Sequence, residues 1–266
     1  MERIISVVFD NETKAYDGSK ALNELDAEGN ISIHAKAVIE KKANGKIDIK
    51  EEGDEFPIRT IGGTAIGALI GLLGGPIGMG IGAVTGTFAG NILDMDRAGV
   101  DAEFLEDVSD KLSPGKWAIV ADISEEWETP LDTQMTALQG TVFRTSRRDY
   151  MREKDAKDVA SIIANIALLE EEKAKSKTEH KAKIQAKIDN LNKKLHVKQE
   201  QAKQRSQRRQ EEVKAKIKAL EKKASKVKGE AKKKIEARIV EMKEQEKKDV
   251  KDFDYWLNAE GYTIHY

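Results

Sequence analysis

The sequence predicts an α+β fold: a small sheet-and-helix domain that is interrupted by an apolar helical hairpin and followed by a long helical region. Three observations predict it. Strand-type and helix-type segments alternate within residues 1–60 and 95–146, and a glycine-periodic apolar run occupies residues 61–94. Residues 147–252 are rich in Lys, Glu, Ala and Gln and contain no proline, and an aromatic C-terminal tail follows at residues 253–266.

The first domain is defined by short periodic segments. Residues 31–41 alternate apolar and polar side chains with the period of a half-buried strand. The Asn44-Gly45 pair then predicts a hairpin, because both positions tolerate positive φ. The predicted order β-α-β-β-α-β is that of a ferredoxin-like split βαβ unit. Its elements are strand 3–9, helix 13–27, strand 31–41, strand 46–50, helix 101–112 and strand 117–123, with residues 140–145 as a further strand.

The apolar run 61–93 carries no charge, and its glycines recur every four residues. On a helix this spacing places each set of glycines on one face, where another backbone can approach closely. Each glycine in a helix interior costs about 1 kcal/mol relative to alanine, so the pattern requires a packing contact that offsets this cost. The predicted helix-packing and oligomerisation residues are Gly63, Gly67, Gly71, Gly74, Gly78, Gly82, Gly86 and Gly90.

Gly74-Gly75-Pro76 interrupts this run, because proline has no amide donor and clashes with the preceding helical turn. The sequence therefore predicts a glycine-zipper hairpin of two short helices. Each arm would rise roughly 21–26 Å, less than the ~30 Å of a bilayer's hydrocarbon core. This favours a re-entrant or one-leaflet hairpin, with one kinked membrane-crossing helix as an alternative. A buried hairpin in the core of a soluble oligomer would show the same glycines.

Residues 147–252 carry the pattern of a coiled coil, with apolar residues at alternating four- and three-residue intervals. Two apolar runs mirror each other about residue 204, which predicts an antiparallel hairpin with its tip near residues 204–206. One continuous helix is the alternative, because neither glycine nor proline marks that tip. The predicted seam residues are Ile184, Ile188, Leu191, Leu195, Val213, Ile217, Leu220 and Val227.

Charge divides the chain into two halves, although its formal net charge is only −1. Residues 1–146 contain 13 Lys/Arg and 25 Asp/Glu, whereas residues 147–252 contain 33 and 20. The densest basic segment, residues 181–234, has 20 Lys/Arg and 6 Asp/Glu. It suits the acidic domain of a second copy, anionic lipid headgroups or nucleic acid. The alternative is a solvated coiled-coil face that binds no partner. Among the three partners nucleic acid is the weakest, because no aromatic side chain for base stacking lies between residues 151 and 252.

No pattern in the sequence indicates catalysis. There is no cysteine, and the four histidines, at positions 34, 180, 196 and 265, are too scattered for a zinc site. Asp122, Glu125, Glu126 and Asp132 are interpreted as a solvated strand end. The segment 78–83 fits a dinucleotide-binding motif formally, but a helical glycine period precedes it instead of a strand. We therefore predict no enzyme, catalytic residue, cofactor, metal or small-molecule substrate.

The opening RIISVVFD, the glycine zipper and the later FLEDVSDKLSPGKWAIVADI resemble the bacterial family called domain of unknown function 1269, described as predicted membrane proteins. The likeness covers about residues 1–146 and leaves the region 147–252 unmatched. It supports a membrane role and adds no catalytic residue. The N-terminus has too short an apolar run for a signal peptide, so we expect a cytoplasmic or cytoplasmic-side membrane location. The sequence thus predicts a homo-oligomeric, membrane-associated scaffold, with a soluble homo-oligomeric shell, ring or filament as the alternative.

Overall fold

The computed structural model describes residues 1–52, 63–74 and 98–259. The chain separates into two compact units. The first consists of Met1–Tyr150 and Lys216–Val240, and the second of Met151–Ala215 and Glu241–Tyr266. The α+β class predicted from the sequence is confirmed, because an antiparallel sheet is combined with a long helical region.

The centre of the first unit is a five-stranded sheet in the order β3-β2-β4-β1-β5, with every neighbouring pair antiparallel. Because β1 and β2 both run antiparallel to β4, they are parallel to each other and β4 separates them. The strands are β1 (Glu2–Phe9), β2 (Ile31–Lys41), β3 (Ile47–Glu52), β4 (Trp117–Glu125) and β5 (Thr141–Thr145).

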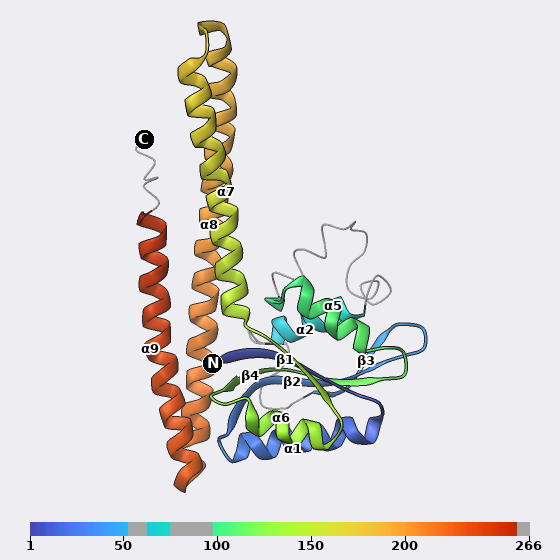
Figure 1. The fold of residues 1–266 in the computed structure, drawn as a ribbon. Helices are drawn as coiled ribbons and strands as arrows, with labels where there is room; N and C mark the ends of the chain where they lie inside the picture. The colour runs from blue at the N-terminus through green and yellow to red at the C-terminus, as the bar shows by residue number, and fades with distance from the viewer. Residues whose placement is uncertain (53–62, 75–97, 260–266) are drawn as a thin grey trace. The chain divides into compact units, whose positions relative to one another are not determined.

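Helices cover both faces of this sheet (Figure 1). Successive strand residues point to opposite faces, so Ile5, Val7 and Phe9 face one apolar core while Ile4 and Val8 face the other. The first core lies beneath α1 (Glu12–Ala27) and α6 (Thr129–Ala137), and the second beneath α2 (Gly63–Leu73) and α5 (Ala102–Lys111).

Local signals explain where these helices and turns lie. The side chain of Asn11 accepts a hydrogen bond from the backbone N–H of Lys14 at 3.0 Å and caps α1. Asp101 caps α5 in the same way through the N–H of Phe104 at 2.7 Å. The predicted hairpin at Asn44-Gly45 is confirmed, with Gly45 at a φ of 80° between β2 and β3.

One helix of the sheet domain was missed and one prediction for the sheet was wrong. Helix α6 was not predicted from the sequence. Strand β2 is not half-exposed, because Ser32, His34 and Lys36 are as buried as their apolar neighbours. The exposed side that the alternation predicts is covered instead, so both faces of β2 are in the protein interior.

Three long helices form the remainder of the chain: α7 (Arg147–Lys175), α8 (Thr178–Ala224) and α9 (Gly229–Ala259). Within the second unit, Val159 and Ile166 of α7 pack against Ile184, Ile188 and Leu195 of α8. The hairpin tip predicted near residue 204 was wrong, because α8 continues through it. The turns lie at residues 176–177 and 225–228 instead, and Gly229 after the second turn has a φ of 65°. The residues around 204 are good helix formers, so nothing local stops the helix there.

Candidate interaction sites

Helix α2 carries the first part of the glycine zipper, and its two faces differ. Its bulky face is buried against the sheet through Ile66, Leu69, Ile70 and Leu73, which belong to the same core as Val120 of β4. This face is therefore occupied by the protein's own core and does not lie free for lipid.

The glycine face of α2 points away from that core. Gly67 is exposed and Gly71 is half-buried. A Cβ atom built on either glycine would meet no atom of the described chain within 4 Å. Gly63 begins the helix, and the buried Gly74 follows its end, where its N–H donates to the carbonyl of Ile70 at 3.1 Å.

The second half of the zipper, including Gly78, Gly82, Gly86 and Gly90, lies outside the described residues. Among the helices of the described ranges, none combines the length and the apolarity that crossing a bilayer requires.

The predicted seam residues all lie in or next to α8. Ile184, Ile188 and Leu195 are buried and Leu191 partly buried against α7. Val213, Ile217 and Leu220 are also buried, whereas Val227 is half-buried in the turn before α9. Ion pairs between Arg209 and Asp249 at 4.0 Å, and between Lys214 and Glu246 at 3.9 Å, join α8 to α9 in the second unit. The predicted seam residues before position 204 thus pack within the chain against α7.

A buried polar cluster lies in the first unit. It involves the C-terminal end of α8 and the N-terminal part of α9. Lys216 of α8 is 5% exposed and its Nζ lies 2.8 Å from Oδ2 of Asp122, whose side chain is 3% exposed. The same Nζ donates to Oε1 of Glu2 at 2.9 Å. A buried ion pair of this kind is costly to break from one side only, because the remaining charge is left in the interior. Lys216 therefore fixes α8 to β1 and β4.

Arg238 of α9 provides the second attachment. Its guanidinium donates to Oγ of Ser32 at 2.6 Å and to the backbone carbonyls of Gly29 and Asn30 at 3.4 and 3.3 Å. Gly29 has a φ of 73°, and a Cβ on it would lie 3.1 Å from the carbonyl oxygen of Ala231. Only glycine combines this backbone conformation with so close an approach of α9.

His34 is buried beside this cluster, and its Nε2 shares a hydrogen bond of 2.8 Å with Oγ of Ser124. Burial, followed by the positive charge of Lys216, holds the pKa of His34 well below its usual value. The imidazole is therefore neutral at physiological pH. A protonated imidazole at this position would be repelled by the positive charges of Lys216 and Arg238.

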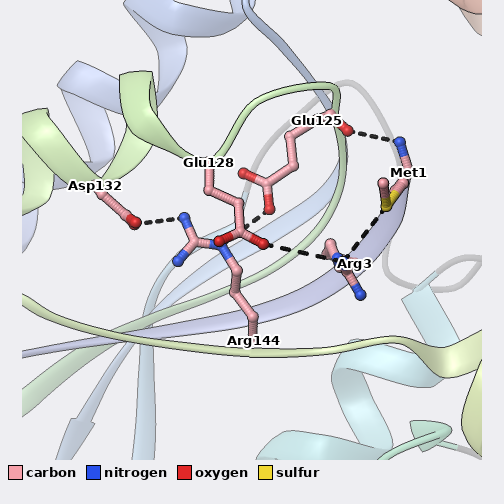
Figure 2. A network of polar contacts seen from close by, with 6 residues as sticks. All are labelled: Met1, Arg3, Glu125, Glu128, Asp132 and Arg144. Atoms are coloured by element: carbon pink, nitrogen blue, oxygen red, sulfur yellow. Dashed lines mark hydrogen bonds and ion pairs between the residues drawn. The ribbon is translucent and has the colours of Figure 1, made fainter.

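A second polar network occupies the other face of the sheet (Figure 2). Nε of Arg144 donates to Oε1 of Glu125 at 2.9 Å, and its NH2 group donates to Oδ1 of Asp132 at 2.5 Å. Burial raises the pKa of Glu125 despite the opposing effect of Arg144. Burial also acts to lower the pKa of Arg144, but its hydrogen bonds to Asp132 and Glu125 outweigh this and raise it. Arg144 thus joins β5, β4 and α6.

These two networks correct the interpretation of four acidic residues as a solvated strand end. Asp122 and Glu125 are each 2% exposed and paired to buried cations. Asp132 is half-buried and only Glu126 is exposed. Within the described residues, no group of three or more His, Asp or Glu side chains is arranged to hold a metal ion.

The cluster of Lys216, Arg238 and His34 was not predicted, because the local sequence offers little signal for it. Lys216 and Arg238 look like any other basic residue of a helical segment in which Lys and Arg are abundant. Ser32 and His34 occupy the polar positions of an alternating strand, and this pattern predicts solvent exposure, not burial beside distant cations.

The fold is that of an α+β protein in which long helices follow a sheet domain. The buried polar cluster described above attaches α8 and α9 to the sheet. Residues 60–160 match the family described as "Protein of unknown function (DUF1269)". The resemblance inferred from the sequence is therefore confirmed for this segment, which contains the zipper, α5, β4, α6 and β5. The chain has no significant match among curated proteins or among solved structures.

Proposed function

We propose that the protein is a homo-oligomeric scaffold that associates with a membrane, in which the glycine-zipper segment joins copies and the long helices hold them side by side. The observation that carries this proposal is the exposed glycine face of α2. Gly67 and Gly71 weaken a helix by about 1 kcal/mol each relative to alanine. No contact with the described chain offsets that cost. A second helix packed on this face would offset it, because backbone approach is closest where side chains are smallest.

The two arms of the zipper make different contacts in this proposal: one with other copies and one with lipid. The bulky face of α2 packs on the chain's own sheet, so α2 contributes its glycine face to assembly. Contact with lipid falls to the second arm, whose sequence between Gly74 and Asp94 is uncharged and carries Ile77, Ile81 and Phe88.

The alternative function, a soluble oligomer with the hairpin as its buried core, is favoured by one observation. The apolar face of α2 is already covered by the sheet, as it would be in a protein that never meets lipid. Both proposals require the same glycine face for self-association, and they differ in what the remaining apolar surface touches.

We also infer that the sheet is a variant of the ferredoxin-like arrangement. In support, β1 and β2 are joined by α1 and split by β4, as in a split βαβ unit. The additional strand β3 pairs with β2 at the sheet's edge. The heptad-spaced residues of α8 are buried within the chain, so we propose that the long helices of neighbouring copies meet through their exposed faces.

The experiment compares the full chain with a Gly67→Leu/Gly71→Leu variant. Mass measurement by light scattering reports assembly, and flotation with vesicles reports lipid association. Leucine favours a helix more than glycine, so the variant is expected to keep its fold by circular dichroism and to lose its oligomer. A Thr133→Leu variant places an exposed leucine on α6 instead and should change neither property.

The outcomes separate the hypotheses. An unchanged oligomer in the double glycine variant would overturn self-association through α2. An oligomer that needs α2 but never floats with vesicles of any composition would support the soluble alternative and overturn the membrane role.

A further inference from the structure

One side of α8 carries a straight row of basic residues. Lys183, Lys187, Lys194 and Arg208 are all exposed. Their separations of 4, 11 and 25 residues are close to whole helical turns, so the four side chains share one side of the helix. From the first to the last, the row extends about 38 Å at a rise of about 1.5 Å per residue. We name these four residues the basic row.

The row contains no acidic residue. Between residues 181 and 209 the chain has ten Lys/Arg and two Asp/Glu, Asp189 and Glu200. At 100° per residue both acids lie roughly 120° around the helix from the row. The other positions along the row are Asn190, Val197, Gln201 and the partly buried Arg205, none of which is acidic.

Packing within the second unit fixes the direction in which the row points. Ile184, Ile188 and Leu195 face α7 in the apolar cluster. The basic row lies about a quarter turn from this seam, on a flank that α7 leaves exposed. Lys198 lies between the seam and the row, and its Nζ binds Oδ2 of Asp158 on α7 at 2.6 Å. In contrast, no ion pair or hydrogen bond joins the basic-row side chains to the described residues.

We propose that the basic row binds the phosphates of anionic lipid headgroups, so that α8 lies along a membrane surface. The proposal rests on the membrane-associated function and names the lipid class and the second contact that it requires. A bilayer is flat over the full length of the row, and each Lys or Arg near such a surface strengthens binding roughly fivefold. A straight helix follows the curved backbone of duplex DNA over only part of that length. Binding of single strands relies on stacking aromatic residues, and α8 contains no Phe, Tyr or Trp.

The test is flotation of the full-length protein with vesicles of phosphatidylcholine alone or mixed with phosphatidylglycerol. We compare the wild type with Lys183→Glu/Lys187→Glu/Lys194→Glu, which reverses the charge of three of the four residues in the row. The matched control is Lys181→Glu/Lys193→Glu/Lys203→Glu, which changes the same net charge at exposed positions of α8 outside the row. Circular dichroism checks that both variants stay helical.

We expect the row variant to lose affinity for phosphatidylglycerol vesicles by a factor on the order of 100. The control variant is expected to lose far less, and high salt to release the wild type. Equal losses in both variants, or none in the row variant, would overturn the proposal. It would also fall if the row variant floated normally but lost affinity for a DNA duplex.

Failure here is distinguishable from failure of the proposed function. The row variant should keep the oligomeric mass of the wild type in the absence of vesicles, because the glycine face of α2 is intact. Loss of lipid binding with an unchanged mass supports the basic row. Loss of mass in the row variant overturns its assignment as a lipid contact.

Discussion

The Nε2 atom of His34 lies 2.8 Å from Oγ of Ser124, in a buried position that also faces three cations of α8 and α9. Lys216 and Lys223 belong to α8, and Arg238 belongs to α9. All three lower the pKa of His34, whereas Glu2 of β1 raises it. Asp122 of β4 pairs with Lys216. A neutral imidazole tolerates this arrangement and a protonated one does not. We therefore expect protonation of His34 to weaken the attachment of the helical segment 216–240.

Acidification should destabilise the first unit through His34. Its pKa is depressed in the folded state, so the unfolded chain binds the proton more readily. The free energy of unfolding then falls as the pH drops below the unfolded pKa of about 6.5, by up to about 1.4 kcal/mol per pH unit. Urea unfolding at pH 7.5 and 5.5 measures this slope. The His34→Gln variant should have a shallower slope than the wild type, and identical slopes would contradict the assignment.

Removal of one partner of the Lys216–Asp122 pair should be costly. In Lys216→Met, the carboxylate of Asp122 stays buried without its cation, and we expect a loss of about 3–5 kcal/mol in the free energy of unfolding. The double variant Lys216→Met/Asp122→Leu removes both charges and should recover a large part of that loss. A double-mutant cycle by urea denaturation gives the coupling, and strictly additive effects would show that the two side chains do not interact.

Loss of Arg144 should produce a pH-dependent defect. In Arg144→Met, the buried carboxylate of Glu125 loses the guanidinium that pairs with it, which we expect to cost about 3 kcal/mol at pH 7. The pKa of Glu125 is already raised, so the folded state takes up its proton more readily than the unfolded state. The defect should therefore shrink as the pH falls through that raised pKa. Urea unfolding at pH 7 and pH 5 measures it. The more exposed Asp132→Asn should cost less than about 1 kcal/mol.

Substitution of alanine for glycine should have opposite effects on stability in α2 and in α1. At Gly67 of α2 an added Cβ meets no described atom, so Gly67→Ala should stabilise the dissociated chain by about 1 kcal/mol through helix propensity. At Gly18 of α1 the same atom would lie 2.6 Å from Cζ of Phe9 and 3.1 Å from Cδ1 of Ile119. Overpacking there should outweigh the helical gain, at about 1–3 kcal/mol. Thermal unfolding of the two variants should shift in opposite directions, and a shift in the same direction would contradict this account.

The elements that the sequence predicted correctly are those with local signals. Strand β1 is a continuous apolar run, α1 and α5 begin at capping side chains, and the hairpin between β2 and β3 contains Asn-Gly. Each of these depends on residues within a few positions of one another, which a single sequence reveals.

The candidate sites were less predictable, because they depend on contacts between distant residues. Lys216 lies 94 positions from Asp122, and Arg238 lies 206 positions from Ser32. Nothing near Lys216 in the sequence distinguishes it from exposed lysines of α8 such as Lys218. Likewise, the exposure of Gly67 depends on which face of α2 the sheet covers, and the four-residue period of the zipper does not determine this.

The mirror symmetry about residue 204 wrongly predicted a helical hairpin, and a distance measurement can test the continuous helix found instead. Seam residues on both sides of it are buried. Helix α7 packs on those before it, and α9 forms ion pairs with α8 beyond it, so a pattern that suits a folded-back pair also suits one continuous helix. Spin labels at Lys193→Cys and Ala215→Cys distinguish the two arrangements, and the absence of cysteine from the chain makes this labelling specific. Along one helix the labelled backbone positions should be about 33 Å apart. If the chain folded back at residue 204 they would be helix neighbours, about 10 Å apart. A dipolar distance near the shorter value would contradict a continuous α8.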